Sequence, residues 1–295
     1  PEAMALADRV AVLRRGRLVL DEGKANVTPQ TLAQAMVGRS METTVQLAKR
    51  APGDVVVSTP LLAVPGEEDG VVRAGETVGV AGVEGNGQTE LAETLVGLRR
   101  GPVRFRTNGG LHDAGAWSIA ERLKWGLAHI PADRHATALA LPAPLRDNLF
   151  LAGEMLPHRG PWTDRTAASR AATALMESYD VRASSPETPA LDLSGGNQQK
   201  VVVAREMSRE PRFLVAMHPT RGLDVAASGF VHDALCAHRS RGGATLLVSS
   251  ELDELLALSD RILVMYGGRV VGEVLPSDPR ADLETLGRLM TGAAG

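Results

Sequence analysis

The arrangement that most limits the fold of this 295-residue chain is a strand, a glycine-rich turn and a helix in immediate succession. Residues 77–81 form a short apolar run, and an apolar helical pattern follows through Leu91 and Leu95. Between them lies the glycine loop, defined here as residues 82–89. Glycines at such a turn let the backbone approach a phosphate, whose oxygens the loop N–H groups can bind. The pattern predicts an anion-binding loop made by Gly82, Gly85, Asn86, Gly87, Gln88 and Thr89.

Apolar strands and amphipathic helices continue to alternate along the chain. Residues 212–217 and 244–249 have the pattern of buried strands, and residues 227–239 between them have the pattern of a helix. Such alternation predicts an α/β fold with a mainly parallel sheet. The glycine loop should then lie at the carboxyl ends of the strands. Residues 110–190 show helical periodicity instead, with an amphipathic helix at residues 165–179.

A second polar turn precedes a helix within residues 193–200, which we call the octapeptide. Ser194 is a favourable N-cap residue, and Gly195 and Gly196 follow it. A serine hydroxyl, glycine N–H groups and a helix N-terminus together form a site for an anionic oxygen. An ordinary capped helix start, without a ligand, is the alternative interpretation of these residues taken alone.

The two ends of the chain resemble each other. Residues 258–265 repeat the pattern of residues 6–13, and Asp8 and Asp260 lie 252 residues apart. A period of this length corresponds to a whole domain rather than to a solenoid repeat. We therefore expect a remnant of a first domain copy, a linker and a complete second copy, at residues 1–45, 46–57 and 58–295.

Composition narrows the possible partners. The net charge is −3, so a general electrostatic attraction to nucleic acid is not expected. Cys236 is the only cysteine, which excludes an internal disulfide framework and fits a reducing compartment. No apolar run approaches the roughly 18 residues that a membrane-spanning helix needs. The sequence contains neither an HExxH nor a CxxC motif that, together with its histidines, would indicate a zinc site. We expect any contact with a membrane to be made through a partner protein.

The octapeptide Leu-Ser-Gly-Gly-Asn-Gln-Gln-Lys resembles the signature motif of ATP-binding cassette (ABC) ATPases, with Gln198 at its usual glutamine. The glycine loop and residues 219–225, 249–251 and 259–261 also match that family, and the resemblance covers the whole chain. It is closest to the ATP-binding subunits of bacterial importers for nucleosides, ribose and related sugars. Those proteins carry two cassettes in one polypeptide.

The resemblance implies a P-loop NTPase fold of the ABC cassette type. Such a cassette has a mainly parallel sheet core, an antiparallel β subdomain and a helical signature subdomain, here at about residues 134–205. The resemblance also implies ATP and Mg²⁺ as ligands and no nucleic acid. Its implied partners are a first cassette, transmembrane permease subunits and, indirectly, a solute-binding protein, at the cytoplasmic face of the membrane. In the family the signature acts in trans, on the γ-phosphate bound to the facing cassette of a dimer. The matching residues are Leu193, Ser194, Gly195, Gly196, Asn197 and Gln198, with Asp224 at the position of the D-loop.

The sequence departs from the family at positions that carry hydrolysis. Gln88 stands in place of the phosphate-binding lysine, Met217 in place of the magnesium-binding aspartate, and His218 in place of the glutamate that polarises water. Ser250 replaces the histidine near the γ-phosphate, and the Q-loop glutamine falls near Ala132. Losing a metal ligand, a base and a phosphate-binding cation together should leave almost no turnover at this loop. We therefore expect one working and one degenerate site in a tandem protein.

Several alternatives stay open on sequence alone. Thr89 keeps the position of a weak magnesium ligand, and His218 could polarise water, although Met217 leaves no carboxylate beside it. The chain could be an energy-coupling subunit of an importer, a non-catalytic nucleotide-binding or scaffold domain, or a cytosolic ABC protein in translation or repair. The form of the octapeptide, the Pro-Thr-Arg-Gly-Leu-Asp segment and the repeat favour the importer.

Overall fold

The computed structural model describes residues 7–14, 17–28, 31, 35, 51–151, 158–159, 162–278 and 283–290. Three of its strands are buried at every position: β5 (Thr77–Ala81), β11 (Phe213–Met217) and β12 (Ala244–Val248). Parallel strands that are covered on both faces have such continuous apolar sequences. These strands therefore form the centre of the main sheet.

The main sheet has six strands in the order β14-β13-β5-β12-β11-β8. Its edge strands are β8 (Leu127–Ile130) and β14 (Arg269–Val274), and β13 (Arg261–Tyr266) lies next to β14. All pairings are parallel except that of β13 with β14, which is antiparallel. The predicted α/β fold with a mainly parallel sheet is confirmed.

A second, antiparallel sheet forms its own layer with the strand order β4-β3-β6-β7. Its strands are β3 (Val55–Thr59), β4 (Gly70–Arg73), β6 (Arg104–Thr107) and β7 (Gly110–Asp113). Phe105 of β6 is fully buried and stacks on Trp125, with ring centroids 4.4 Å apart. This layer is the antiparallel β subdomain expected for the cassette fold.

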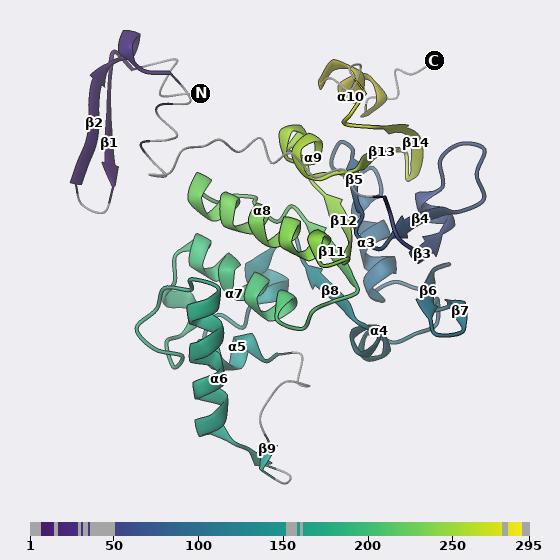
Figure 1. The fold of residues 1–295 in the computed structure, drawn as a ribbon, viewed down its shortest axis with the longest axis horizontal. Helices are drawn as coiled ribbons and strands as arrows, with labels where there is room; N and C mark the ends of the chain where they lie inside the picture. The colour runs from purple at the N-terminus through teal and green to yellow at the C-terminus, as the bar shows by residue number, and fades with distance from the viewer. Residues whose placement is uncertain are drawn as a thin grey trace.

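The main sheet separates two hydrophobic cores, because successive side chains of a strand point to opposite faces. Phe213 and Val215 of β11 pack in one core with the antiparallel sheet and α3 (Gln88–Val96). Leu214 and Ala216 pack in the other core with α7 (Gly195–Met207) and α8 (Val225–Ser240). Figure 1 shows α7 and α8 on one side of the strands and α3 on the other. The helix after the glycine loop and the helix of the octapeptide thus cover opposite faces.

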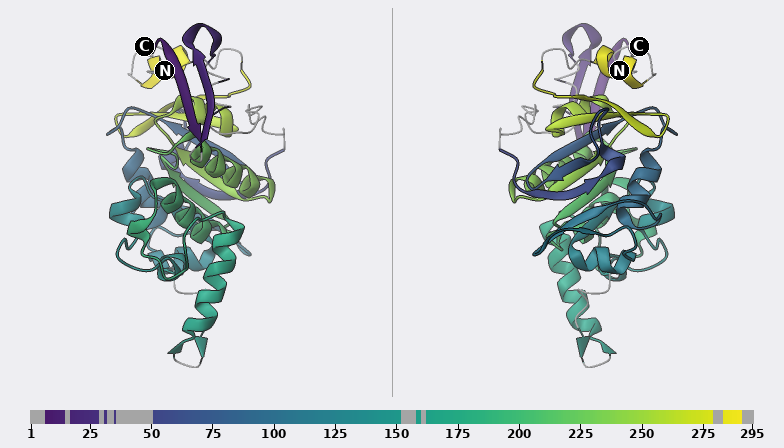
Figure 2. Two further views of the ribbon diagram at one scale, coloured as in Figure 1. Left: turned by 90° about the vertical axis from the view of Figure 1, so that its left-hand side faces the viewer. Right: turned by 90° about the vertical axis from the view of Figure 1, so that its right-hand side faces the viewer.

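The helical part of the domain is formed by the short helix η3 (Arg134–Ala138), α5 (Leu145–Leu149), α6 (Arg165–Ser178) and α7. In Figure 2, α6 extends away from the sheets toward the two-residue strands β9 (His158–Arg159) and β10 (Trp162–Thr163). This part corresponds to the helical subdomain that the cassette fold implies.

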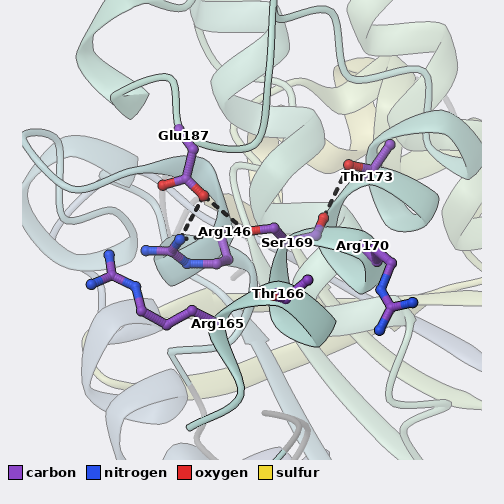
Figure 3. A pocket seen from close by; sticks show the side chains of 7 residues that line it. All are labelled: Arg146, Arg165, Thr166, Ser169, Arg170, Thr173 and Glu187. Carbon is purple, nitrogen blue, oxygen red and sulfur yellow. Dashed lines mark hydrogen bonds and ion pairs between the residues drawn. The ribbon is translucent and has the colours of Figure 1, made fainter.

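A buried arginine ties the loop before α7 to α5 and α6. Arg146 is 5% exposed and donates to Asp147 Oδ1 at 2.8 Å and to Glu187 Oε1 at 2.5 Å. Ser169 of α6 donates to the same oxygen of Glu187 at 2.8 Å, as Figure 3 shows. This network fixes one side of the segment that leads into the octapeptide.

The remaining described helices are η1 (Lys24–Asn26), η2 (Pro60–Leu62), α4 (Ile119–Trp125), η4 (Ala190–Asp192), α9 (Leu252–Leu258) and α10 (Leu283–Met290). None of the described helices combines the length and the apolar character that crossing a bilayer requires.

The two related chain ends form hairpins with the same geometry. At the amino end, β1 (Arg9–Arg14) pairs with β2 (Arg17–Gly23) as a separate two-stranded sheet. Val10 pairs with Glu22, as Ile262 pairs with Val274 in the hairpin of β13 and β14. The register shifts after Val12 in one hairpin and after Val264 in the other, again 252 residues apart. Residues 36–50, which include the first part of the predicted linker and the end of the predicted remnant, lie outside the described residues.

Candidate functional site

The glycine loop leaves the carboxyl end of β5 and ends at the start of α3, where the sequence predicts it. Gly85 and Gly87 have φ angles of 91° and 101°, a left-handed conformation that glycine adopts without strain. A Cβ atom on Gly87 would lie 2.8 Å from the Cα atom of Gly268, so the close packing also requires glycine. Gly87 is the N-cap of α3 and no side chain caps this helix. The first N–H groups of α3 therefore lack intrahelical acceptors, as an anion site requires.

Two amide side chains close the glycine loop upon itself. The carbonyl oxygen of Val83 accepts hydrogen bonds from Asn86 Nδ2 at 3.0 Å and from Gln88 Nε2 at 3.1 Å. The Asn86 backbone N–H also donates to it, at 3.2 Å. Gln88 is only 7% exposed. The residue in the lysine position is therefore neutral, buried and engaged within the loop instead of presenting a charge to a phosphate.

The β13–β14 hairpin holds the loop from the other side. Gly267 N donates to Asn86 Oδ1 at 2.8 Å, and Gly268 N donates to the Asn86 carbonyl oxygen at 3.1 Å. Asn86 thus bonds through its amide nitrogen to the loop and through its amide oxygen to the hairpin. These contacts fix the closed shape of the loop to the sheet.

His218 lies directly after β11, beside the segment that follows β12. Its φ angle is 43°, which is uncommon for a residue other than glycine. Ser250 N donates to His218 Nδ1 at 3.2 Å, so Nδ1 is unprotonated and a neutral ring carries its proton on Nε2. Burial, and then the charge of Arg221, lower the pKa of His218 below its ordinary value. The structure therefore brings His218 and Ser250 together as a neutral pair.

Sequence reasoning missed a buried carboxylate in the same region. Glu254 of α9 is 5% exposed, and its Oε1 accepts from Thr220 Oγ1 at 2.8 Å and lies 2.9 Å from His232 Nε2. Burial alone would raise the pKa of Glu254, but hydrogen bonds from His232, Ser249 and Thr220 together outweigh it and lower the pKa. The sequence feature that could have indicated Glu254 is that it is a carboxylate on the apolar face of residues 252–258. Glu254 holds the segment after β11 in place.

An exposed ion pair links the glycine loop to that segment. Arg221 Nη1 lies 3.9 Å from Glu84 Oε1, and the two side chains are 61% and 86% exposed. At this exposure the pair contributes little stability. It shows that residue 84 of the loop and the segment after β11 are within side-chain reach of each other.

The residues at the predicted metal position are poor ligands for Mg²⁺. Magnesium prefers hard oxygen ligands in octahedral geometry. Thr89 is exposed and can offer one hydroxyl, but Met217, at the position of the family's aspartate, offers only a thioether. Within the described part of the chain, no three His, Cys, Asp or Glu side chains gather in a way that could hold a metal. The residues present therefore do not fit a protein-held magnesium ion.

The octapeptide presents an open helix start. Ser194 is the N-cap of α7, as predicted, but its side chain makes no capping bond. Its Oγ instead accepts from Asn197 Nδ2 at 3.1 Å, while Asn197 Oδ1 accepts from Arg182 N at 2.9 Å. Ser194 is exposed, and the first intrahelical bond is made by Gln198 N. The Ser194 hydroxyl proton and the first N–H groups of α7 therefore remain available to an anionic oxygen.

Neighbouring loops position the start of α7. Gln198 is buried, with its Oε1 2.7 Å from His135 Nε2 and its Nε2 donating to the Ala190 carbonyl oxygen at 3.1 Å. Arg134 donates to the Arg221 carbonyl oxygen at 3.3 Å, and a Cβ on Gly195 would lie 2.8 Å from its guanidinium. Helix α7 is thereby tied to the segment after β8, close to where the Q-loop position Ala132 lies.

The other predicted residues have local structural roles. Asp224 caps α8 by accepting from Ala227 N at 2.8 Å, and a Cβ on Gly196 would lie 3.0 Å from that of Ala227. Leu193 packs, half-buried, against the core beneath α7. The structure thus gathers the octapeptide and Asp224 at one set of helix starts, and the glycine loop, His218 and Ser250 at the ends of the strands.

Comparison with known proteins identifies the class. The sequence profile of the family described as "ABC transporter" matches residues 69–221, which is more than half of the chain. This chain belongs to the ABC transporter family. Members of that family bind nucleotide, usually with Mg²⁺.

Relatives and solved structures agree with this assignment. The chain is 38% identical to "Nucleoside import ATP-binding protein NupA" of Lactococcus lactis subsp. cremoris, covering 99% of this chain and 59% of the relative. It is 39% identical to "Glucose import ATP-binding protein TsgD13" of Haloferax volcanii, covering 99% and 54%. "Ribose import ATP-binding protein RbsA 2" of Rubrobacter xylanophilus is 38% identical, with 92% and 53% covered. The chain therefore spans a little over half the length of these relatives.

A solved structure described as "Structure of ATP binding subunit of ABC transporter" aligns with a TM-score of 0.62 at 20% identity. The alignment covers 80% of this chain and 99% of that one. A nucleotide-free ATP-binding cassette from an ABC transporter aligns with a TM-score of 0.60. At these identities the similarity establishes the fold, and the ABC cassette fold is confirmed.

Proposed function

We propose that this chain is the ATP-binding, energy-coupling part of an importer for nucleosides or simple sugars. The names of relatives that are 34–39% identical over most of the chain support this proposal. In the same proposal this cassette supplies its signature octapeptide to another cassette in trans and is itself degenerate in hydrolysis.

The observation that carries the trans proposal is the contrast between the two helix starts. Ser194 is exposed and its hydroxyl is oriented by Asn197, so α7 can donate to an anionic oxygen. The glycine loop of the same domain is closed by Gln88, and its helix covers the other face of the sheet. The neutral pair of His218 and Ser250 adds no carboxylate to that loop. A working octapeptide beside a poor glycine loop is useful only to a second nucleotide site.

The domain organisation follows as part of this proposal. Residues 1–45 form the end of a first cassette, residues 46–57 a linker, and residues 58–295 a second cassette with its helical subdomain at about residues 134–205. The shared register of the two hairpins supports the repeat. The partners are a first cassette, permease subunits and, through them, a solute-binding protein, at the cytoplasmic face of the membrane.

ATP hydrolysis by the complete gene product tests the shared site. Changing Ser194→Arg places a bulky cation at the open helix start, and loss of one such oxyanion contact typically costs about 10²–10³ in rate. We expect hydrolysis to fall by about that factor while the protein still binds ATP. Ser178→Arg, on the exposed end of α6, is the matched control and should keep full activity. Equal activity of the Ser194→Arg variant and the control would contradict the trans role.

A non-catalytic nucleotide-binding or scaffold domain is the second candidate. The inward-turned Gln88 and the thioether at Met217 favour it, because neither can assist phosphoryl transfer. Fluorescent ATP titrated into the 295-residue chain separates the cases. Saturable binding without turnover, together with normal hydrolysis in the complete Ser194→Arg protein, supports the scaffold over the importer subunit.

A further inference from the structure

Two neighbouring cavities open at the amino ends of β11 and β12, at the edge of the main sheet opposite the glycine loop. They have volumes of about 480 and 490 Å³, and Trp125 and Arg212 line both. Cavities of this size are in the usual range for small-molecule sites. We call the two together the basic cleft. It takes no part in the contacts of the glycine loop or of the octapeptide described above.

The basic cleft concentrates positive charge in a chain whose net charge is −3. Four cations line it, against the single carboxylate Glu210; they are Arg106, Lys124, Arg212 and Arg241. Across residues 51–151 and 162–278, none of the four cationic groups forms an ion pair. Four cations beside one carboxylate leave the cleft with a positive balance, so an anion bound there would be attracted.

Helix ends account for only part of this charge. Lys124 lies in the last turn of α4 and Arg241 is the C-cap of α8, where cations commonly stabilise a helix. Arg106 lies on β6 and Arg212 in the turn before β11, so no helix end explains them. Arginine donors form a planar fork that matches phosphate oxygens.

The cleft also has a fixed apolar wall. Trp125 is half-buried, stacks on Phe105, and donates from its indole Nε1 to the Arg106 carbonyl oxygen at 2.8 Å. A Cβ on Gly243 would lie within 2.4 Å of three atoms of the His238 ring, so that ring packs directly against the backbone of the wall. Burial lowers the pKa of His238 to about 4, which leaves it neutral near pH 7. His238 therefore adds no charge to the cleft near pH 7.

We propose that the basic cleft binds a mononucleotide, with its phosphate on Arg212 and Arg241 and its ring against the Trp125 wall. The guanidinium groups supply charge-assisted hydrogen bonds, and an aromatic wall contributes about 1–3 kcal/mol for a stacked base. A bare phosphate would leave the wall uncovered, and an uncharged nucleoside would leave the cations unpaired. This site goes beyond the proposed function, since it needs neither hydrolysis nor a permease.

Indole N–H resonances of the ¹⁵N-labelled 295-residue chain test the proposal. The chain has three tryptophans, and Trp125→Phe assigns the resonance that belongs to the cleft. We expect a saturable shift of the Trp125 resonance with adenosine monophosphate, binding about tenfold weaker with inorganic phosphate, and no shift with adenosine. Binding should also weaken with added salt, because the contact is between exposed charges.

Two double variants make the test specific. Changing Arg212→Ala and Arg241→Ala together should weaken adenosine monophosphate binding at least about tenfold. The matched control changes Arg165→Ala and Arg170→Ala, two exposed arginines beside the cavity of Figure 3, and should bind as the wild type does. If the first variant fails to fold, the salt dependence of wild-type binding replaces it. No saturable shift at about 10 mM, salt-independent binding, equal binding by phosphate, or equal binding by the cleft variant overturns the proposal.

Discussion

The glycine loop and the octapeptide are built from similar parts, yet one is closed and the other open. Each is a glycine-bearing turn before a helix whose N-cap makes no side-chain bond. In the glycine loop, Asn86 and Gln88 both donate to the Val83 carbonyl oxygen. In the octapeptide, Asn197 donates to the hydroxyl of Ser194 and leaves that residue exposed.

The comparison indicates that the acceptor to which an amide side chain donates decides whether the N-terminus of the helix is available to a ligand. A loop carbonyl oxygen holds the amide within the loop, as that of Val83 holds Asn86 and Gln88. A hydroxyl oxygen keeps its own proton when it accepts, so it can still donate outward. The same residue type therefore closes one site and orients the other.

Among single substitutions, the largest effect on stability should come from removing Arg122, the cation beneath α3. Arg122 is fully buried and donates to the carbonyl oxygens of Thr94, Leu95 and Ala114. Arg122→Met removes this donor from the Thr94 and Leu95 oxygens, while the Ala114 oxygen still accepts from Trp117 N at 3.0 Å, so we expect a loss of about 3–5 kcal/mol in the free energy of unfolding by urea. Arg99→Met, an exposed arginine paired with Glu93, should cost less than about 1 kcal/mol. Equal losses in the two variants would show that the glycine-loop side does not depend on this network.

Acid should destabilise the fold next, through His129 of β8 and His238 of α8. Burial lowers the folded-state pKa of His129 and of His238 to about 4, and the charge of Arg205 on α7 also lowers that of His129. The unfolded chain, with an ordinary value of 6.5, binds more protons between these limits. Stability is therefore complete above pH 6.5 and is lost as the pH falls toward 4, by up to about 3 kcal/mol per histidine.

Urea unfolding at a series of pH values measures this loss, and hydrogen-exchange protection shows where it occurs. We expect protection of α8 to fall through His238, which lies on that helix, and protection of β8 to fall through His129. His129→Gln should remove about half of the pH dependence. An unchanged slope in that variant would contradict the assignment to His129.

Opening the glycine loop should have an intermediate effect, and the quantity that changes is the affinity for ATP. Gln88→Lys replaces the inward amide by a cation, and one charge-assisted hydrogen bond is worth about 1.5–3 kcal/mol. We expect ATP to bind the 295-residue chain roughly 10–100-fold more tightly, as measured by calorimetry. Gln88→Met keeps the length without a charge and should give no gain. Tighter binding by both variants would mean that loss of the amide, and not the new charge, opens the loop.

The smallest effect on stability and hydrolysis is expected from substitution of Asn197. Asn197→Ala removes the bond to Ser194 Oγ and the bond from Arg182 N, which should cost about 1 kcal/mol of stability. Hydrolysis by the complete gene product should fall by less than in Ser194→Arg, because the hydroxyl is present but no longer oriented. Asn108→Ala, at an exposed turn of the antiparallel sheet, is the control. Full activity of Asn197→Ala would show that the hydroxyl needs no orientation.

Local patterns in the sequence predict the elements well. Residues 77–81 and 244–249 correspond to β5 and β12, and residues 165–179 correspond to α6 within one residue. These elements are predictable because burial of a strand or of one helix face leaves a period in the sequence. The positions of the glycine loop and of the octapeptide follow from the same patterns, since each lies at the junction of a turn and a helix.

Whether each of these two helix starts is closed or open was not predictable from local patterns. The sequence shows that Gln88 is not lysine, but not that its amide turns back onto Val83. It indicates Ser194 as an N-cap, but not that Asn197 takes the place of the capping bond. The role of Glu254 depends on Thr220 and His232, which lie 34 and 22 residues away. Such contacts join separate parts of the chain and leave no local period.

By itself the sequence determined the family, the α/β architecture and the places where nucleotide-related chemistry could occur, because these depend on residue types at fixed spacing. Only the tertiary structure decided which helix start is closed and which is open, that the two helices cover opposite faces of the sheet, and that four cations gather around Trp125. The physical reason is that hydrogen bonds and charge interactions depend on distance and direction in space. Those are set only when β5, β11 and β12 bring distant loops to the two edges of one sheet.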